Sequence, residues 1–150
     1  MASSLVDPAA GSATAPNRVL TAGSPRTLVV RRVLTNTGTD TVTRLQLRLN
    51  SISEENGAGP AIGSAPPNPA WIRLIAPAEA TTTITVGGRS VTVHNLVADP
   101  PAAVGGSGLN TVVPVPLPTG GLAPGASVAV AFAFAVDRGG TFWFTYLAES

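Results

Sequence analysis

The chain contains no cysteine and no lysine, only one histidine, and few charged residues of either sign. The absence of cysteine excludes disulfides, thiolate nucleophiles and cysteine-based zinc sites. The chain has nine arginines and eight carboxylates, so its net charge is only +1. It therefore lacks the strongly basic charge that is typical of nucleic-acid-binding domains. These absences exclude chemistry at cysteine and give no indication of a nucleic-acid partner.

Long apolar segments are also missing. No stretch free of glycine and proline approaches the roughly 18 residues that a membrane span requires. The first residues lack the basic region and the apolar region of a signal peptide. We therefore expect no membrane insertion, and either a chain that stays inside the cell or a piece of a longer exported protein.

Apolar residues and turn formers are what the chain has in quantity. Apolar residues make up 44% and charged ones 11%, against the roughly 25% charged of typical soluble domains. Sixteen glycines and fourteen prolines punctuate short alternating runs, which is typical of many turns between short strands. A length of 150 residues fits one domain. We assign residues 1–25 to an extended arm or linker, and residues 26–150 to a β-sandwich domain.

The firmest strand prediction covers residues 128–136, where large and small side chains alternate without a break. A period of two places the valines and phenylalanines on a core face and the alanines on the other face. Residues 137–140 have the composition of a turn, and the aromatic run at residues 141–147 gives the second strand of a hairpin. On that strand Phe142, Phe144 and Tyr146 share one face, so Trp143 lies on the other.

Six further segments have strand character: residues 27–35, 41–49, 71–75, 81–86, 90–97 and 111–117. We expect the first two to form a hairpin, and residues 81–97 to form another around Gly87 and Gly88. Pro114 and Pro116 cannot donate to a strand ladder, so residues 111–117 belong at a sheet edge. The prediction is an all-β fold, an antiparallel immunoglobulin-like β-sandwich of seven to nine strands, with a jelly roll as the alternative.

Five fragments, spread over most of the chain, form a series. They are residues 31–38 (RRVLTNTG), 42–48 (VTRLQLR), 105–110 (GGSGLN), 122–127 (LAPGAS) and 140–144 (GTFWF). In this order they resemble an immunoglobulin-like β-sandwich module found at or near the C-terminus of large bacterial exported and surface proteins. Asn36 stands alone where that family carries a pair of asparagines, and the glycine-rich loop lacks the usual Pro-Asn start. The resemblance implies an exported, non-catalytic module, and it assigns no ligand and no functional residue.

No combination of residues carries a catalytic signature, so we predict that the chain is not an enzyme. His94 is the only histidine and no nucleophile motif accompanies it, so we expect a structural role for it. Glu54 and Glu55 lie in a long polar segment, residues 50–70, without the alternating spacing of calcium loops. The glycines of residues 105–108 lack the helix and lysine of a phosphate loop. We predict no cofactor and no metal.

The alanine face of residues 128–136 gives the candidate interaction surface. If the last two strands pair, Ala129, Ala131, Ala133, Trp143 and Leu147 make a flat, uncharged outer patch where sandwiches usually carry polar groups. Trp71 is the sixth residue of the candidate interaction surface. Apolar patches of more than a few hundred Å² usually mark contact sites. The alternative is that proline-rich segments such as residues 66–69 fold back and cover this face.

We predict a non-catalytic structural or interaction module of a bacterial surface or secreted protein, located outside the cell or on its surface. Its partners are other protein subunits or neighbouring modules, including a second copy of the chain. One alternative is a self-assembling subunit, such as a virion decoration protein or a filament subunit. Another is a carbohydrate-binding module in which Trp71, Trp143 and Tyr146 form a stacking platform, although a glycan is the less favoured partner.

Overall fold

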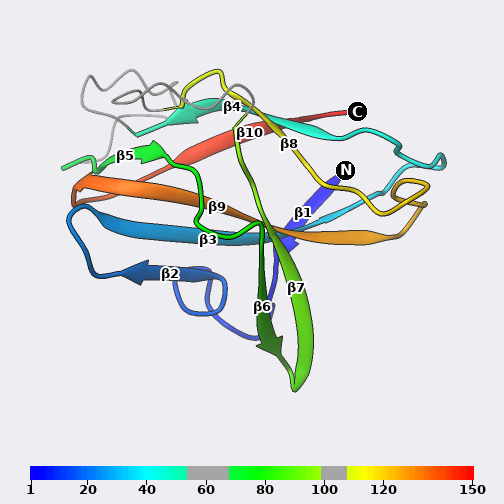
Figure 1. Ribbon diagram of the computed structural model, residues 1–150, viewed down its shortest axis with the longest axis horizontal. Helices are drawn as coiled ribbons and strands as arrows, with labels where there is room; N and C mark the ends of the chain where they lie inside the picture. Colours follow the sequence, from blue (N-terminus) through cyan, green and yellow to red (C-terminus); the bar gives the residue numbers. More distant parts are fainter. Residues whose placement is uncertain (54–67, 99–107) are drawn as a thin grey trace.

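A computed structural model gives the fold and describes residues 1–53, 68–98 and 108–150 (Figure 1). Within these ranges the chain forms strands and no helix, so the all-β prediction is confirmed, and no helix long and apolar enough to span a membrane is present. The strands are β1 (Ala2–Leu5), β2 (Arg18–Thr21), β3 (Arg26–Thr35), β4 (Gln46–Ile52), β5 (Trp71–Leu74), β6 (Thr81–Val86), β7 (Arg89–Asn95), β8 (Val112–Pro114), β9 (Ser127–Arg138) and β10 (Phe144–Glu149).

The larger sheet has seven strands and is centred on β3 and β9, which pair antiparallel over ten residues. The other edge of β3 is shared by β1 and β2. The other edge of β9 is shared by β5 and β7, and β6 then follows β7 at the end of the sheet. The pairing of β7 with β9 is parallel, which corrects the expectation of an entirely antiparallel fold.

The smaller sheet has three strands in the order β10-β4-β8 (Figure 1). Its strand β8 carries Pro114 and lies at an edge, as the prolines of this segment predict. With ten described strands in two sheets, the count exceeds the predicted seven to nine.

The core lies between the two sheets. From β9 it receives Val128, Val130, Phe132 and Phe134, which confirms the predicted core face of this strand. The rings of Phe132 and Phe134 lie 5.1 Å and 4.8 Å from the ring of Phe144 on β10. The inward leucines Leu45, Leu47 and Leu49 also belong to the core, since alternate residues of this stretch point to opposite faces of the smaller sheet.

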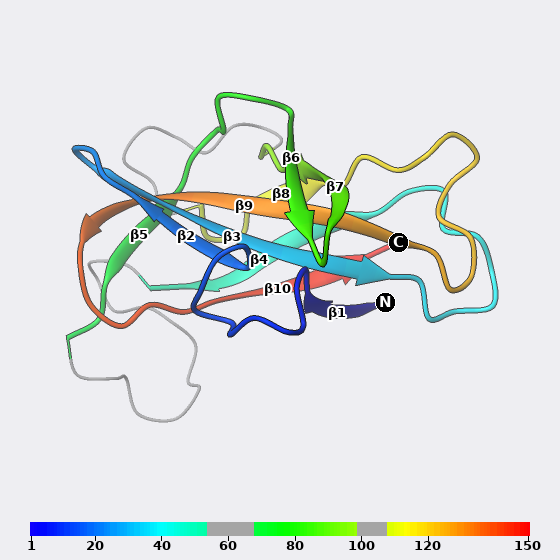
Figure 2. The same cartoon turned by 90° about the horizontal axis from the view of Figure 1, so that it is seen from below.

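Two predicted hairpins are wrong, because their strands lie in different sheets. Strand β9 pairs with β3, β5 and β7, whereas β10 pairs with β4 (Figure 2). Strands β3 and β4 are likewise separated between the larger and the smaller sheet. The physical reason is that the phenylalanines of β9 and the aromatic face of β10 contact one another across the core, which requires opposite layers.

The segment expected to be an arm, residues 1–25, contributes to the larger sheet. Residues 2–5 and 18–21 pair with β3 as β1 and β2. Between them the buried Asn17 holds the chain, since its Nδ2 donates to the carbonyl oxygens of Asp7, Ala10 and Gly11. Its Oδ1 accepts the N–H of Asp7 at 2.8 Å. The segment therefore has hydrogen-bonded partners within the chain.

Candidate functional site

The alanines of the predicted contact surface are buried within the chain. The side chains of Ala129, Ala131 and Ala133 are only 8%, 2% and 6% exposed. The hairpin β6–β7 projects across the outer side of β3 and β9 and covers Ala129 and Ala131 (Figure 2). Ala133 lies instead beside the segment after β5, where its carbonyl oxygen accepts the N–H of Ile75. The hairpin's apolar residues pack on Ala129 and Ala131 together with Val6, so the prediction of an exposed alanine patch is wrong. The described cover consists of the hairpin and Val6 of the N-terminal segment. Of residues 66–69, named as the alternative cover, the structure describes only 68 and 69.

The other three members of the predicted surface, Leu147, Trp143 and Trp71, lie apart from the alanines. Leu147 is 53% exposed on the outer face of the smaller sheet, opposite Arg48. Trp143 precedes β10 and is half-buried, with its carbonyl oxygen accepting the N–H of Ser53 at 2.9 Å. Trp71 begins β5 in the larger sheet, where the guanidinium of Arg138 stacks on its ring at 5.1 Å. The six predicted residues therefore form no single surface.

Tyr146 does not belong to a stacking platform of the kind proposed for a carbohydrate. The ring of Tyr146 packs toward the core, 5.2 Å from the ring of Phe132. Its hydroxyl forms a hydrogen bond of 2.7 Å with the hydroxyl of Ser3 on β1. The tyrosine thus joins the two sheets and does not share a face with Trp143.

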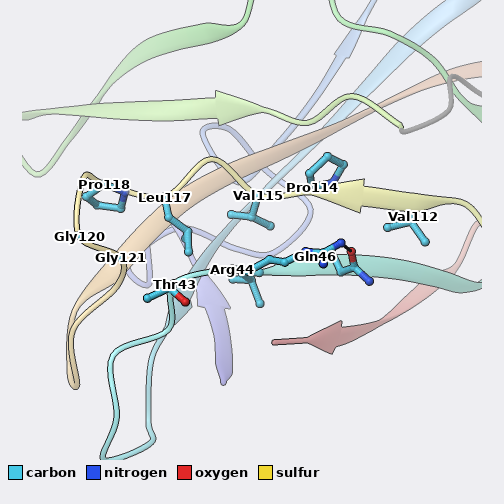
Figure 3. Close-up of a pocket in the computed structure, with 11 residues that line it drawn as sticks. Thr43, Arg44, Gln46, Val112, Pro114, Val115, Leu117, Pro118, Gly120 and Gly121 are labelled. Atoms are coloured by element: carbon cyan, nitrogen blue, oxygen red, sulfur yellow. Dashed lines mark hydrogen bonds between the residues drawn. The ribbon is translucent and has the colours of Figure 1, made fainter.

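A hollow of about 430 Å³ marks the outer side of the smaller sheet, where β4 begins (Figure 3). Arg44 and Gln46 line it from one side, and Pro114 and Leu117 from the other. The side chains continue into a network, because Arg44 Nη2 donates to Gln46 Oε1 at 3.1 Å and Gln46 Nε2 donates to the Glu149 carboxylate at 2.7 Å. The hollow therefore has apolar side chains on one side and hydrogen-bonded polar side chains on the other.

Glu149 is the centre of that network. Arg48 donates to both oxygens of its carboxylate, at 2.8 Å and 3.3 Å. Hydrogen bonds from Arg48 and from Gln46 hold the pKa of the Glu149 carboxyl below its usual value. The hydrogen bond between Arg48 and Glu149 also raises the pKa of the Arg48 guanidinium. Two guanidinium groups, those of Arg44 and Arg48, accompany one carboxylate, so this surface keeps an excess positive charge.

Two further hollows open on the larger sheet. One of about 400 Å³ remains beside the covered alanine face, lined by Ala131, Ala133 and Arg31. Arg31 Nη1 donates to the carbonyl oxygen of Pro16 at 2.8 Å, and burial lowers the pKa of this guanidinium. The other, of about 510 Å³, lies at one end of the sandwich beside Arg18, whose guanidinium stacks on Phe142 at 5.3 Å.

The remaining candidates for chemistry lie apart from one another. His94 on β7 is half-buried, with Thr81 and Val130 as its strand neighbours. Asp137 forms an ion pair with Arg73 at 2.8 Å that joins β9 to β5. Among the described residues no group of three or more histidines and carboxylates could hold a metal ion. Glu54 and Glu55, and the glycine-rich segment 105–108 apart from Gly108, lie outside the described residues.

Sequence reasoning missed two buried asparagines that organise loops. Asn36 Nδ2 donates to the carbonyl oxygens of Asp40 and Leu122, both at 2.8 Å, and its Oδ1 accepts the N–H of Gly38. The pattern Asn-x-Gly after a strand is a signal for such an Asx turn. For Asn17 no local signal exists, since its partners depend on how residues 7–11 fold back.

Comparison with known proteins gives no relative from which function can be transferred. The chain matches no protein-family model, no curated protein and no solved structure.

Proposed function

We propose that this chain is a non-catalytic structural or interaction module of a bacterial surface or secreted protein, related to immunoglobulin-like β-sandwich modules. The fragment series that runs from residues 31–38 to residues 140–144 supports this proposal by resemblance. The location that follows is extracellular or at the cell surface, with a virion as the alternative. No cofactor takes part.

The way charged side chains are used also supports a module without chemistry. Arg48 and Glu149 bridge β4 and β10, and Arg73 and Asp137 bridge β5 and β9. Arg31 ties β3 to the segment before β2 through Pro16. These groups hold strands together, and none is paired with a nucleophile and a base in the geometry that hydrolysis needs.

The observation that carries the proposal is the outer face of the smaller sheet. There Leu147 is more than half exposed, and it lies opposite Arg48 and on the same sheet as the hollow beside Arg44. Arginine is enriched in protein contact surfaces, and the exposed leucine beside it adds apolar area that a partner would bury. The partner is another protein subunit or a neighbouring module.

A photo-cross-linker at position 147 tests the contact face in the cells that produce the chain. The matched control is the same cross-linker at Ser24, an exposed polar position between β2 and β3. We expect position 147 to give a discrete product with a surface or secreted protein, and Ser24 to give none. Equal labelling from both positions would contradict the contact face.

A substrate panel tests the absence of catalysis. We expect the purified chain to leave ester and glycoside substrates unchanged. Turnover above the buffer rate that disappears in His94→Ala would show an enzyme and would overturn the proposal.

A further inference from the structure

Strand β6 leaves one of its edges unpaired at the end of the larger sheet. Among the described residues it pairs only with β7, in a continuous register from Thr81 to Val86 without a bulge. Its six residues, Thr-Thr-Thr-Ile-Thr-Val, include no charge, no proline and no glycine. Proteins usually protect exposed edges with charged residues or proline, with bulges or with a covering loop. The edge β8 of the smaller sheet carries Pro114, whereas β6 has no comparable protection.

The hairpin geometry decides which backbone groups this edge offers. Because Gly87 and Gly88 form a two-residue turn with φ of 55° and 77°, Val86 and Arg89 are a hydrogen-bonded pair. Alternate residues of an antiparallel ladder face opposite edges, so every second residue back from Val86 also bonds to β7. The N–H and C=O groups of Thr81, Thr83 and Thr85 therefore point to the open edge, and all three side chains are exposed.

We propose that β6 pairs antiparallel with β6 of a second copy of this chain, joining two seven-stranded sheets across a two-fold axis. This inference rests on the proposed function as an interaction module and adds a contact with a second copy, separate from the face around Leu147. Thr83 would lie opposite Thr83 of the second copy, and Thr81 opposite Thr85. In this register each of the three pairs exchanges two backbone hydrogen bonds, which is the pattern of strand addition at a sheet edge.

Charge complementarity is the reason for choosing a second copy in antiparallel orientation. Glu79 lies two residues before β6, and Arg89 lies beside its last residue, Val86. Both side chains are exposed, and neither forms an ion pair with another described residue. Antiparallel pairing brings the Glu79 end of one copy to the Arg89 end of the other, at both ends of the ladder. Parallel pairing would place like charges together, which is unfavourable.

The size of the ladder sets the strength of association. The paired residues 81–85 of each copy and their threonine side chains bury less surface than the roughly 1,200–2,000 Å² of a stable protein interface. The pair is therefore weak in isolation and becomes strong only where many copies are held close together. This behaviour suits a module that is repeated along a surface.

Sedimentation velocity over a concentration series on the whole chain tests the pairing. We expect the wild type to shift reversibly from monomer to dimer at high concentration. In Thr83→Pro the outward N–H is lost while the ladder with β7 keeps its bonds, so dimerisation should weaken by about tenfold or more. The matched control Thr83→Ala keeps the N–H and should dimerise like the wild type.

A charge exchange keeps the test decisive even if the proline variant does not fold. At low salt, Glu79→Arg alone and Arg89→Glu alone should each weaken dimerisation several-fold, and the double variant should restore it. A monomer at every concentration, or a dimer that is indifferent to Thr83→Pro and to the charge exchange, overturns the inference. Neither result concerns catalysis or the face around Leu147, so failure of this pairing remains distinct from failure of the proposed function.

Discussion

Two adjacent glycines allow the energetic cost of a steric contact to be measured separately from the cost of backbone strain. Gly120 and Gly121 have nearly equal φ angles of 89° and 92°, a region that side chains rarely adopt. A Cβ atom added at Gly120 would meet nothing within 4 Å. At Gly121 it would lie 2.6 Å from the carbonyl oxygen of Val42 and 3.0 Å from the Thr41 side chain. Gly120→Ala and Gly121→Ala therefore share the strain and differ in the contact.

The magnitudes follow from these contacts. Positive φ costs alanine roughly 1–2 kcal/mol at either position. In Gly121→Ala the Val42 oxygen must also move, and that oxygen accepts the N–H of Leu122 at 2.8 Å while the Val42 N–H donates back at 3.0 Å. Weakening two backbone hydrogen bonds costs a further 1–3 kcal/mol or so. We expect Gly121→Ala to lower the free energy of unfolding by about 1–3 kcal/mol more than Gly120→Ala.

Urea unfolding followed by circular dichroism measures both variants, with the m-value as a check on cooperativity. The expected result is a modest fall in midpoint for Gly120→Ala and a much larger one for Gly121→Ala. Equal losses would refute the reasoning, because they would show that the bridge between Val42 and Leu122 is absent or yields freely.

Three further predictions concern the N-terminal segment, the charged network and the alanine face. Asn17→Ala should lower the free energy of unfolding by about 1–3 kcal/mol and speed amide exchange in residues 2–11; an unchanged stability would mean that the segment is an arm after all. The pKa of Glu149 is lowered in the folded state, so its contribution is present above the unfolded pKa of about 4.3 and is lost as pH falls through the lower folded value. Between about pH 7 and about pH 2, the free energy of unfolding should fall less steeply in Glu149→Gln than in the wild type. An identical pH dependence of the two proteins would contradict the network. Ala129→Leu should cost about 1–3 kcal/mol by overpacking, whereas Ala133→Leu can extend into the adjoining hollow and should cost less; thermal melts in which both are neutral would mean that the face is open.

Local patterns predicted much of the secondary structure. Alternation marked the core faces of β4 and β9, and the paired glycines marked the turn of the hairpin β6–β7. Pro114 marked an edge strand. Each of these features depends on residues close in sequence, and the chemistry of a strand face or a two-residue turn is complete within them.

The pairing of strands could not be predicted in the same way. Strands β3 and β9 are nearly a hundred residues apart along the chain, and nothing local selects one as the partner of the other. The aromatic segment after β9 is compatible with a hairpin by composition alone. It crosses to the other sheet because Phe144 and Tyr146 contact Phe132 from the opposite side of the core, a condition visible only after both layers are assembled.

The alanine face shows where the candidate site departed from its prediction. An uninterrupted apolar run from residue 128 to 136 is typical of a strand buried on both faces, which requires a cover on each side. Sequence cannot decide whether the cover comes from the chain itself or from a partner. Here it is internal, because Val93 on the hairpin is wholly buried beside Ala129 and Ala131. Of the predicted surface only Leu147 remains substantially exposed.

That internal cover also accounts for the open edge of β6. To cover the alanines, the hairpin must present an apolar inner side, and Ile84 and Val91 provide it as strand neighbours. It must then project away from the plane of β9, which carries β6 beyond the reach of any other described strand. Ile84 and Val86 of β6 are half-buried against the alanine face, so twisting β6 away or replacing it with a charged loop would expose the alanines beneath it. Burial of one apolar surface therefore leaves a hydrogen-bonding edge available, and a second copy of the same edge is complementary to it in both backbone geometry and charge.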